Sequence, residues 1–141
     1  MKISILLTTL VTFMLLGPVF NKTGDKLPNS TLTNILTGKT VDIEKRVRSS
    51  KKPTLIVLWS RSCHVCLNEI EKLKTYKLPL ITITYTTNIE SMKSFLEDRM
   101  IGYTVLAGDD KVFAKYGAIV VPYWLLVDSN MKILKQGGGE I

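Results

Sequence analysis

Metal-ligating side chains are scarce in this sequence of 141 residues. It contains two cysteines, Cys63 and Cys66, and a single histidine, His64. A structural zinc site has four cysteine or histidine ligands, so these three clustered residues do not predict one. Covalent haem attachment needs a histidine directly after the second cysteine, where Leu67 stands. Copper delivery would require a longer cysteine spacing and a distant histidine. We therefore expect no metal and no cofactor.

Low-complexity tracts, internal repeats and interleaved basic and aromatic residues are also lacking. With 45% hydrophobic residues the chain is not disordered, and 19 Lys and Arg against 12 Asp and Glu give a formal net charge of +7. The one basic cluster, at residues 45–52, has no nucleic-acid-binding motif beside it. We expect no nucleic-acid partner. The cluster is most simply a solvated loop, and contact with anionic lipid headgroups is the better functional alternative.

The first 20 residues contain the longest uncharged apolar stretch. No charged side chain occurs from Ile3 to Phe20, and this length just suffices to span a bilayer. Because no pair of small residues marks a good cleavage point, we favour a retained signal anchor over a cleaved signal peptide for residues 1–20. Residues 21–30 are polar and predict a linker that holds the following domain, residues 31–141, close to the membrane.

Cys63 and Cys66 lie where a buried strand is expected to lead into a helix. Residues 54–59 form an apolar run after Pro53, typical of a central strand that is covered on both faces. A Cys-X-X-Cys pair at such a junction indicates a redox site, because the helix N-terminus stabilises the first thiolate. A structural disulfide or two inert thiols are the alternatives. Since a disulfide is most useful in an oxidising compartment, we expect export.

Hydrophobic periodicity predicts the remaining elements. Val65, Cys66 and Ile70 are expected on the buried face of the helix that follows Cys63, and Ile89, Met92, Phe95, Leu96 and Met100 on that of a second helix. The order of elements predicts an α/β sandwich around one mixed sheet. The predicted elements are strands at 32–35 and 40–43 around a glycine turn, a helical turn at 44–50, strands at 54–59, 80–85 and 104–106, helices at 63–76, 88–99 and 109–117, and strands at 124–127 and 132–136.

In this order the chain resembles the thioredoxin superfamily, and more closely the membrane-anchored thiol–disulfide oxidoreductases of the TlpA type. The resemblance extends over roughly residues 27–138 and rests on the segments 37–43, 58–66 and 116–122. It implies a three-layer sandwich with a central mixed sheet and an N-terminal β-hairpin. It also implies a closing C-terminal helix, for which the sequence leaves no room after Gly138.

The resemblance implies a role for three residues of the helix that follows the strand. Cys63 would be the exposed nucleophile, and Cys66 would resolve the mixed disulfide that Cys63 forms. Glu69 would act as the general base for Cys66. The alternative for Glu69 is an ordinary solvated glutamate that pairs with Lys72 at i to i+3.

Four further residues are expected on the substrate-binding side. The resemblance implies a cis Val121–Pro122 bond against the cysteines, with the Val121 backbone free to pair with an extended substrate. A trans proline that ends a loop is the alternative. Trp59 would pack beneath the site. His64 either stabilises the thiolate when it is protonated or is a solvent-exposed residue at the helix start.

Departures from the usual motifs leave the direction of electron flow open. Ser62 stands in place of a tryptophan, Val57 in place of a buried aspartate, and no proline separates the cysteines. A threonine and a proline ahead of a single peroxidatic cysteine, as a peroxidase needs, are also absent. The resemblance favours an exported reductase of protein disulfides at the periplasmic face of the membrane or cell envelope. We expect a monomer that is recharged by a membrane electron donor. An oxidase or isomerase of disulfides and a redox-inactive binding module are the alternatives.

Overall fold

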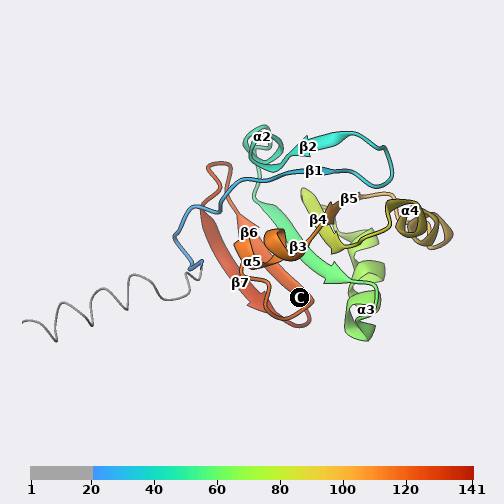
Figure 1. The fold of residues 1–141 in the computed structure, drawn as a ribbon. Helices are drawn as coiled ribbons and strands as arrows, with labels where there is room; N and C mark the ends of the chain where they lie inside the picture. The colour runs from blue at the N-terminus through green and yellow to red at the C-terminus, as the bar shows by residue number, and fades with distance from the viewer. Residues whose placement is uncertain (1–20) are drawn as a thin grey trace, which may run out of the picture.

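A computed structural model describes residues 21–141, which form a central five-stranded sheet and a separate two-stranded hairpin (Figure 1). The strand order in the central sheet is β5-β4-β3-β6-β7. β3, β4 and β5 are parallel, whereas β6 and β7 are antiparallel to their neighbours. The predicted mixed sheet is thus confirmed. The strands are β1 (Thr31–Thr33), β2 (Thr40–Asp42), β3 (Thr54–Ser60), β4 (Leu80–Tyr85), β5 (Thr104–Gly108), β6 (Tyr123–Val127) and β7 (Ile133–Gly138).

Helices cover both faces of the sheet, because β3 is apolar on both sides. Ile56 and Leu58 point to the face that is covered by α2 (Ile43–Arg48) and α5 (Asp110–Lys115). Trp59 points to the opposite face, which is covered by α3 (His64–Lys72) and α4 (Ile89–Asp98) (Figure 1). α3 continues into a 3₁₀ turn, Leu73–Thr75. This arrangement makes three layers.

Side-chain caps fix where three of the helices begin. Asp42, Asn88 and Asp109 each accept a hydrogen bond from the backbone N–H three residues further on, at 3.0 or 3.1 Å. Such caps satisfy one of the backbone donors that the first turn of a helix leaves free. The sequence predicts helices that start at Asn88, as a cap, and near Asp109, and the structure confirms both starts.

The predicted buried faces of α3 and α4 are wrong at three positions. Val65 is 43% exposed, whereas Glu69 is 2% exposed. Val65 lies next to Cys66, which is fully buried, so Val65 is on the outward side of the first turn of α3. Ile89, the first residue of α4, is 39% exposed, and Met100 is 82% exposed because α4 has already ended at Asp98.

The hairpin and the N-terminal segment close the two edges of the sheet. The backbone N–H of Ile35 donates to the carbonyl of Val105 at 2.9 Å, so the residue after the hairpin's first strand lies along β5. At the other edge, Leu27 is fully buried and its N–H donates to the carbonyl of Met131 at 2.7 Å. The segment predicted as a linker at 21–30 is therefore bound to the domain, because its apolar residue fills the core. Covering edge strands in this way prevents pairing with other chains.

The anchor predicted for residues 1–20 lies outside the described residues. Between residues 21 and 141, no helix is both long and apolar enough to cross a membrane. β7 is the last helix or strand of the described residues.

The sheet topology brings two loops together at one edge. The carboxyl ends of β3, β4 and β5 share this edge because the three strands are parallel. β6 runs in the opposite direction, and its first residue, Tyr123, pairs with Leu58 near the end of β3. The loop at 61–63 therefore lies beside the loop at 118–122.

Candidate active site

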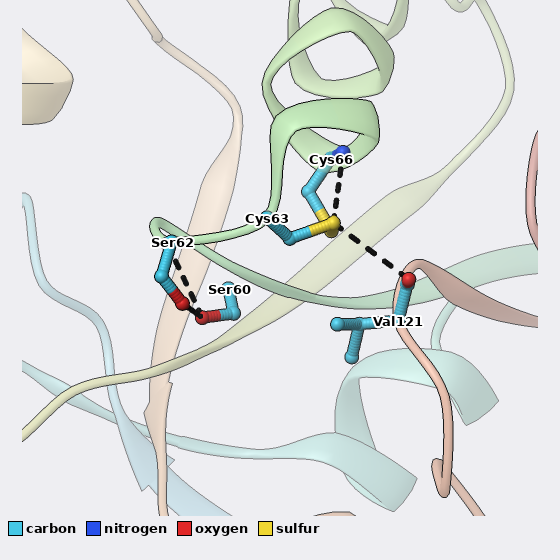
Figure 2. The surroundings of a disulfide bond; sticks show 5 residues. All are labelled: Ser60, Ser62, Cys63, Cys66 and Val121. Carbon is cyan, nitrogen blue, oxygen red and sulfur yellow. Dashed lines mark hydrogen bonds between the residues drawn. A yellow bond between two sulfur atoms is a disulfide. The ribbon is translucent and has the colours of Figure 1, made fainter.

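Cys63 and Cys66 lie at the N-terminus of α3 and are joined in a disulfide (Figure 2). Cys63 is the N-cap residue of the helix, and its Sγ accepts a hydrogen bond from the backbone N–H of Cys66 at 3.1 Å. Cys63 is half-buried, whereas Cys66 has no exposed surface. Of the two cysteines, only Cys63 has surface that a second protein can contact, which is the asymmetry that a nucleophile and a resolving cysteine require.

Val121 approaches the same sulfur from the opposite loop. Its carbonyl oxygen lies 3.7 Å from the Sγ of Cys63, as Figure 2 shows. The Val121–Pro122 bond is cis, which confirms the sequence prediction. The backbone N–H of Val121 has no hydrogen-bond partner within residues 21–141. An extended chain that lies beside Val121 can therefore hydrogen-bond to this N–H.

Trp59 supports the site from below. Its side chain is completely buried, and its Nε1 donates a hydrogen bond to the Oγ1 of Thr82 at 3.2 Å. The hydroxyl of Thr82 in turn donates to the carbonyl of Thr104 at 3.1 Å. These bonds fix the indole across three neighbouring strands. Because none of its surface is exposed, Trp59 contributes to substrate binding only through the residues it supports.

His64 is the first residue of α3, and its side chain is exposed. The predicted position at the helix start is thus confirmed. Exposed on the rim of the site, the imidazole is free to meet an incoming substrate. Its role towards the thiolate stays a prediction.

Glu69 is buried on α3, three residues after Cys66. Its Oε1 lies 3.3 Å from the Nζ of Lys72, and its Oε2 accepts a hydrogen bond from the backbone N–H of Ile141 at 3.4 Å. The predicted pairing with Lys72 is present, but the carboxylate is 2% exposed rather than solvated. Residues three apart lie on the same side of a helix, so Glu69 and Cys66 are buried next to each other along α3.

Ionic and aromatic contacts fix α3 against α4. The guanidinium groups of Arg61 and Arg99 lie 4.5 and 4.7 Å from the ring centroid of Phe95. Arg99 also contacts Glu71, and the pKa of Glu71 is lowered mainly by its hydrogen bond to Lys74 and further by Arg99. Arg61 directly precedes the Ser62–Cys63 turn, so these contacts hold the loop that carries the nucleophile.

Two cavities lie beside the loops that carry Cys63 and Val121, and they differ in their lining residues. One has a volume of about 460 Å³ and is lined largely by apolar residues; the other has about 480 Å³, and most of its lining residues carry a polar group. Ser60 and Tyr85 line both of them. The apolar cavity is also lined by Asp110, Phe113, Ala114, Ala118, Ile119 and Val121, and the polar one by Arg61, Ser62, Thr86, Thr87, Asn88, Ser91 and Met92.

Apart from Val121, the residues that form the apolar cavity were not predicted from the sequence. Tyr85 and Phe113 are far apart in the chain, and only the sheet topology brings them within 6.1 Å, centroid to centroid. One signal was available in the sequence: Ile119 and Val120 are adjacent apolar residues in a loop, directly before Val121. They are 76% and 58% exposed. No group of three potential metal ligands occurs in the described part of the chain.

Comparison with known proteins places this geometry among redox proteins. A sequence model of the AhpC/TSA family matches residues 23–136. Among curated protein sequences, none matches the chain significantly. Several solved structures of thiol–disulfide oxidoreductases share its fold, which is therefore thioredoxin-like.

Three of these structures illustrate the similarity. A Chlorobium tepidum protein described as a thiol:disulfide interchange protein, DsbE, is 20% identical, with a TM-score of 0.70 over 85% of this chain and 87% of that one. The thioredoxin domain of a Bacteroides vulgatus thiol-disulfide oxidoreductase is 21% identical, with a TM-score of 0.69 over 82% of this chain and 88% of that one. A secreted Mycobacterium tuberculosis disulfide oxidoreductase is 19% identical, with a TM-score of 0.63 over 77% of this chain and 82% of that one.

Proposed function

The chain belongs to the AhpC/TSA family, and from this premise we propose that it is a protein dithiol–disulfide oxidoreductase that acts through Cys63 and Cys66. The observation that carries the proposal is the unequal exposure of the two cysteines. A half-buried cysteine at a helix N-terminus is joined to a fully buried one within the same turn. A purely structural disulfide does not need one accessible sulfur.

The reductive reaction proceeds through two thiol–disulfide exchanges. The Cys63 thiolate attacks one sulfur of a substrate disulfide. A bond forms between that sulfur and the Sγ of Cys63, the substrate S–S bond breaks, and the other substrate sulfur leaves as a thiolate. Cys66 then loses its proton and attacks the Sγ of Cys63. The Cys63–Cys66 disulfide forms, and the second substrate sulfur leaves. Two electrons pass from the dithiol of the chain to the substrate disulfide.

Three features of the site would lower the barrier to these steps. The backbone N–H of Cys66 and the positive end of α3 stabilise the Cys63 thiolate. The Val121 backbone would hold the substrate in an extended conformation beside Cys63. Glu69 is the one carboxylate buried next to Cys66 along α3, and we assign it the role of accepting the Cys66 proton.

We further propose that the chain is exported, acts as a monomeric reductase, and receives electrons from a membrane donor. Three observations support export: the uncharged apolar stretch at residues 3–20, the disulfide, and the similarity to a secreted disulfide oxidoreductase. The reductive direction follows the resemblance to TlpA-type proteins. The substrates would be disulfide-bonded proteins of the cell envelope.

Trapping of mixed disulfides tests the proposed function. In the full chain carrying Cys66→Ala, the first exchange can occur but the second cannot, so protein substrates should stay bonded to Cys63. They should be seen as species that migrate more slowly on non-reducing gels and disappear on reduction. The matched control is the double variant Cys63→Ala/Cys66→Ala, which has the same fold without a thiol. Trapping of no species by Cys66→Ala in cells would favour a redox-inactive binding module.

A further inference from the structure

The apolar cavity is joined to the reactive sulfur through Val121. Val121 lines this cavity, and its carbonyl oxygen lies 3.7 Å from the Sγ of Cys63. Ser60, which ends β3, lines it as well. A substrate cysteine bonded to Cys63 would have its Cα about 5.5 to 6 Å from the Cα of Cys63. The Cα of each neighbouring substrate residue is a further ~3.8 Å away. A neighbour that extends past Val121 therefore reaches the cavity.

The walls of the cavity are apolar side chains that the fold leaves exposed. Ile119 is 76% exposed and Tyr85 38% exposed, although both are large. Exposed apolar surface of this kind next to a reaction centre marks a binding site. The floor includes Phe113, which packs edge-on against Tyr85 and lies over Gly108, where a Cβ atom would be 3.2 Å from the Phe113 ring. The cavity is thus preformed by packing.

The second cavity makes the site asymmetric. It lies on the other side of Ser60 and Tyr85, and most of its lining residues carry a polar group, among them Arg61 and Asn88, although apolar surface is present there as well. On the α5 side an apolar substrate side chain is buried against apolar residues, whereas on the α4 side it would also cover hydroxyl, amide and guanidinium groups without hydrogen-bonding to them. Only one of the two residues that flank the substrate cysteine can therefore use the apolar cavity.

We infer that the protein selects substrates in which one residue adjacent to the reacting cysteine has a large aliphatic or aromatic side chain, which enters the cavity between Tyr85, Phe113 and Ile119. This inference rests on the proposed function, because it takes the occupant to be the segment that carries the substrate cysteine. It adds a sequence preference to an exchange reaction that by itself requires only a disulfide.

Three short peptides test the inference, each with one cysteine as a mixed disulfide with thionitrobenzoate. One has Phe directly before the cysteine, one has Phe directly after it, and one has Ser on both sides. The full chain carrying Cys66→Ala attacks the peptide sulfur through Cys63, and the coloured thionitrobenzoate leaves. We expect one of the two Phe peptides to react about tenfold faster than the Ser peptide.

Variants of exposed residues show whether the cavity causes the preference. Ala114→Trp fills the cavity from the exposed side of α5, and Lys111→Trp adds the same side chain to α5 outside the cavity. Ile119→Ser removes apolar surface without touching the core. We expect Ala114→Trp and Ile119→Ser to reduce the preference to about twofold or less, and Lys111→Trp to keep it.

The outcomes separate failure of the inference from failure of the proposed function. Dithiobis(nitrobenzoate), which has no flanking residues, should react equally with all variants. If it reacts and the three peptides have equal rates, the inference is wrong and the exchange function stands. A preference that persists in both Ala114→Trp and Ile119→Ser also overturns the inference. If neither the small disulfide nor any peptide reacts, the proposed function itself is wrong.

Discussion

The Sγ of Cys63 accepts a hydrogen bond from the backbone N–H of Cys66 at 3.1 Å, so the residue that we propose to resolve the mixed disulfide is placed to stabilise the proposed nucleophile as well. The two cysteines therefore have different chemistry although they are on one helical turn. The N–H group stabilises negative charge on Cys63, while Cys66 is fully buried.

Alkylation should distinguish the two thiols after reduction. We expect iodoacetamide to modify Cys63 at least about tenfold faster than Cys66, because the thiolate is the reactive species and only Cys63 is accessible. Mass spectrometry of peptides after short exposure measures the ratio, with the urea-unfolded chain as the control in which both react alike. Equal rates in the folded chain would contradict the assignment of the nucleophile.

Glu69→Gln should slow the second exchange. The substitution keeps the shape of the side chain but removes its ability to accept the Cys66 proton, and loss of a general base costs about tenfold or more. The measurement is the rate at which a preformed mixed disulfide on Cys63 is released, as a function of pH. Iodoacetamide labelling of Cys63 should be unchanged.

Glu71→Gln is the matched control for Glu69→Gln. Glu71 is an exposed glutamate on the same helix, two residues further on, and its side chain is 42% exposed. We expect it to leave the release rate and its pH profile unaltered. Equal slowing in both variants would indicate that the helix is merely destabilised, and Glu69 would then not be a base.

Asp42 should make stability depend on pH under acidic conditions. The backbone N–H of Lys45 and then the Asn29 side chain donate to this carboxylate and hold its pKa below the ordinary value of 3.8. A lowered folded pKa adds stability above the unfolded pKa, and this contribution is lost as pH falls through the folded pKa. Asn is also a good N-cap, so Asp42→Asn keeps the cap without the charge.

Urea unfolding at pH values from about 3 to about 6 checks this dependence, because this interval includes the ordinary carboxylate pKa of about 4. The wild-type chain should be more stable than Asp42→Asn at the upper end. The difference should shrink as pH falls below the ordinary value. A difference that is constant with pH would show that the charge at Asp42 is not stabilising.

Gly108→Ala should destabilise the fold and disturb the apolar cavity. An added Cβ would lie 2.6 Å from the Cγ2 of Ile83, which is fully buried, and overpacking of this kind costs about 1 to 3 kcal/mol. Gly102→Ala is the matched control, since its Cβ would meet nothing within 4 Å. Denaturant unfolding of both variants measures the effect. Equal stability of the two would contradict the close packing at β5.

Most of the fold could be predicted from the sequence, because its elements have strong local signals. The alternation at 80–85 predicts β4 with its observed bounds, and the cap at Asn88 predicts the start of α4. The faces of the helices were less predictable. Val65 is apolar but exposed, and Glu69 is charged but buried, because burial depends on which side of α3 packs against the rest of the domain, and that is set by contacts far along the chain.

The candidate site was predictable only where a motif marks it. The cysteines and the cis Val121–Pro122 bond follow from short motifs. The cavity does not, because Tyr85, Phe113 and Ile119 come from β4, α5 and a loop that meet only through the order of the strands. The spacing of residues along the chain does not predict which distant segments come into contact.

The reduction potential of the Cys63–Cys66 pair tests the central claim most directly. The full chain is equilibrated in glutathione or dithiothreitol buffers of defined ratio, and the fraction of dithiol is read by alkylation. A reductase of protein disulfides should have a potential near that of thioredoxin, about −270 mV. A potential near that of the strong oxidant DsbA, about −120 mV, would contradict the reductive direction.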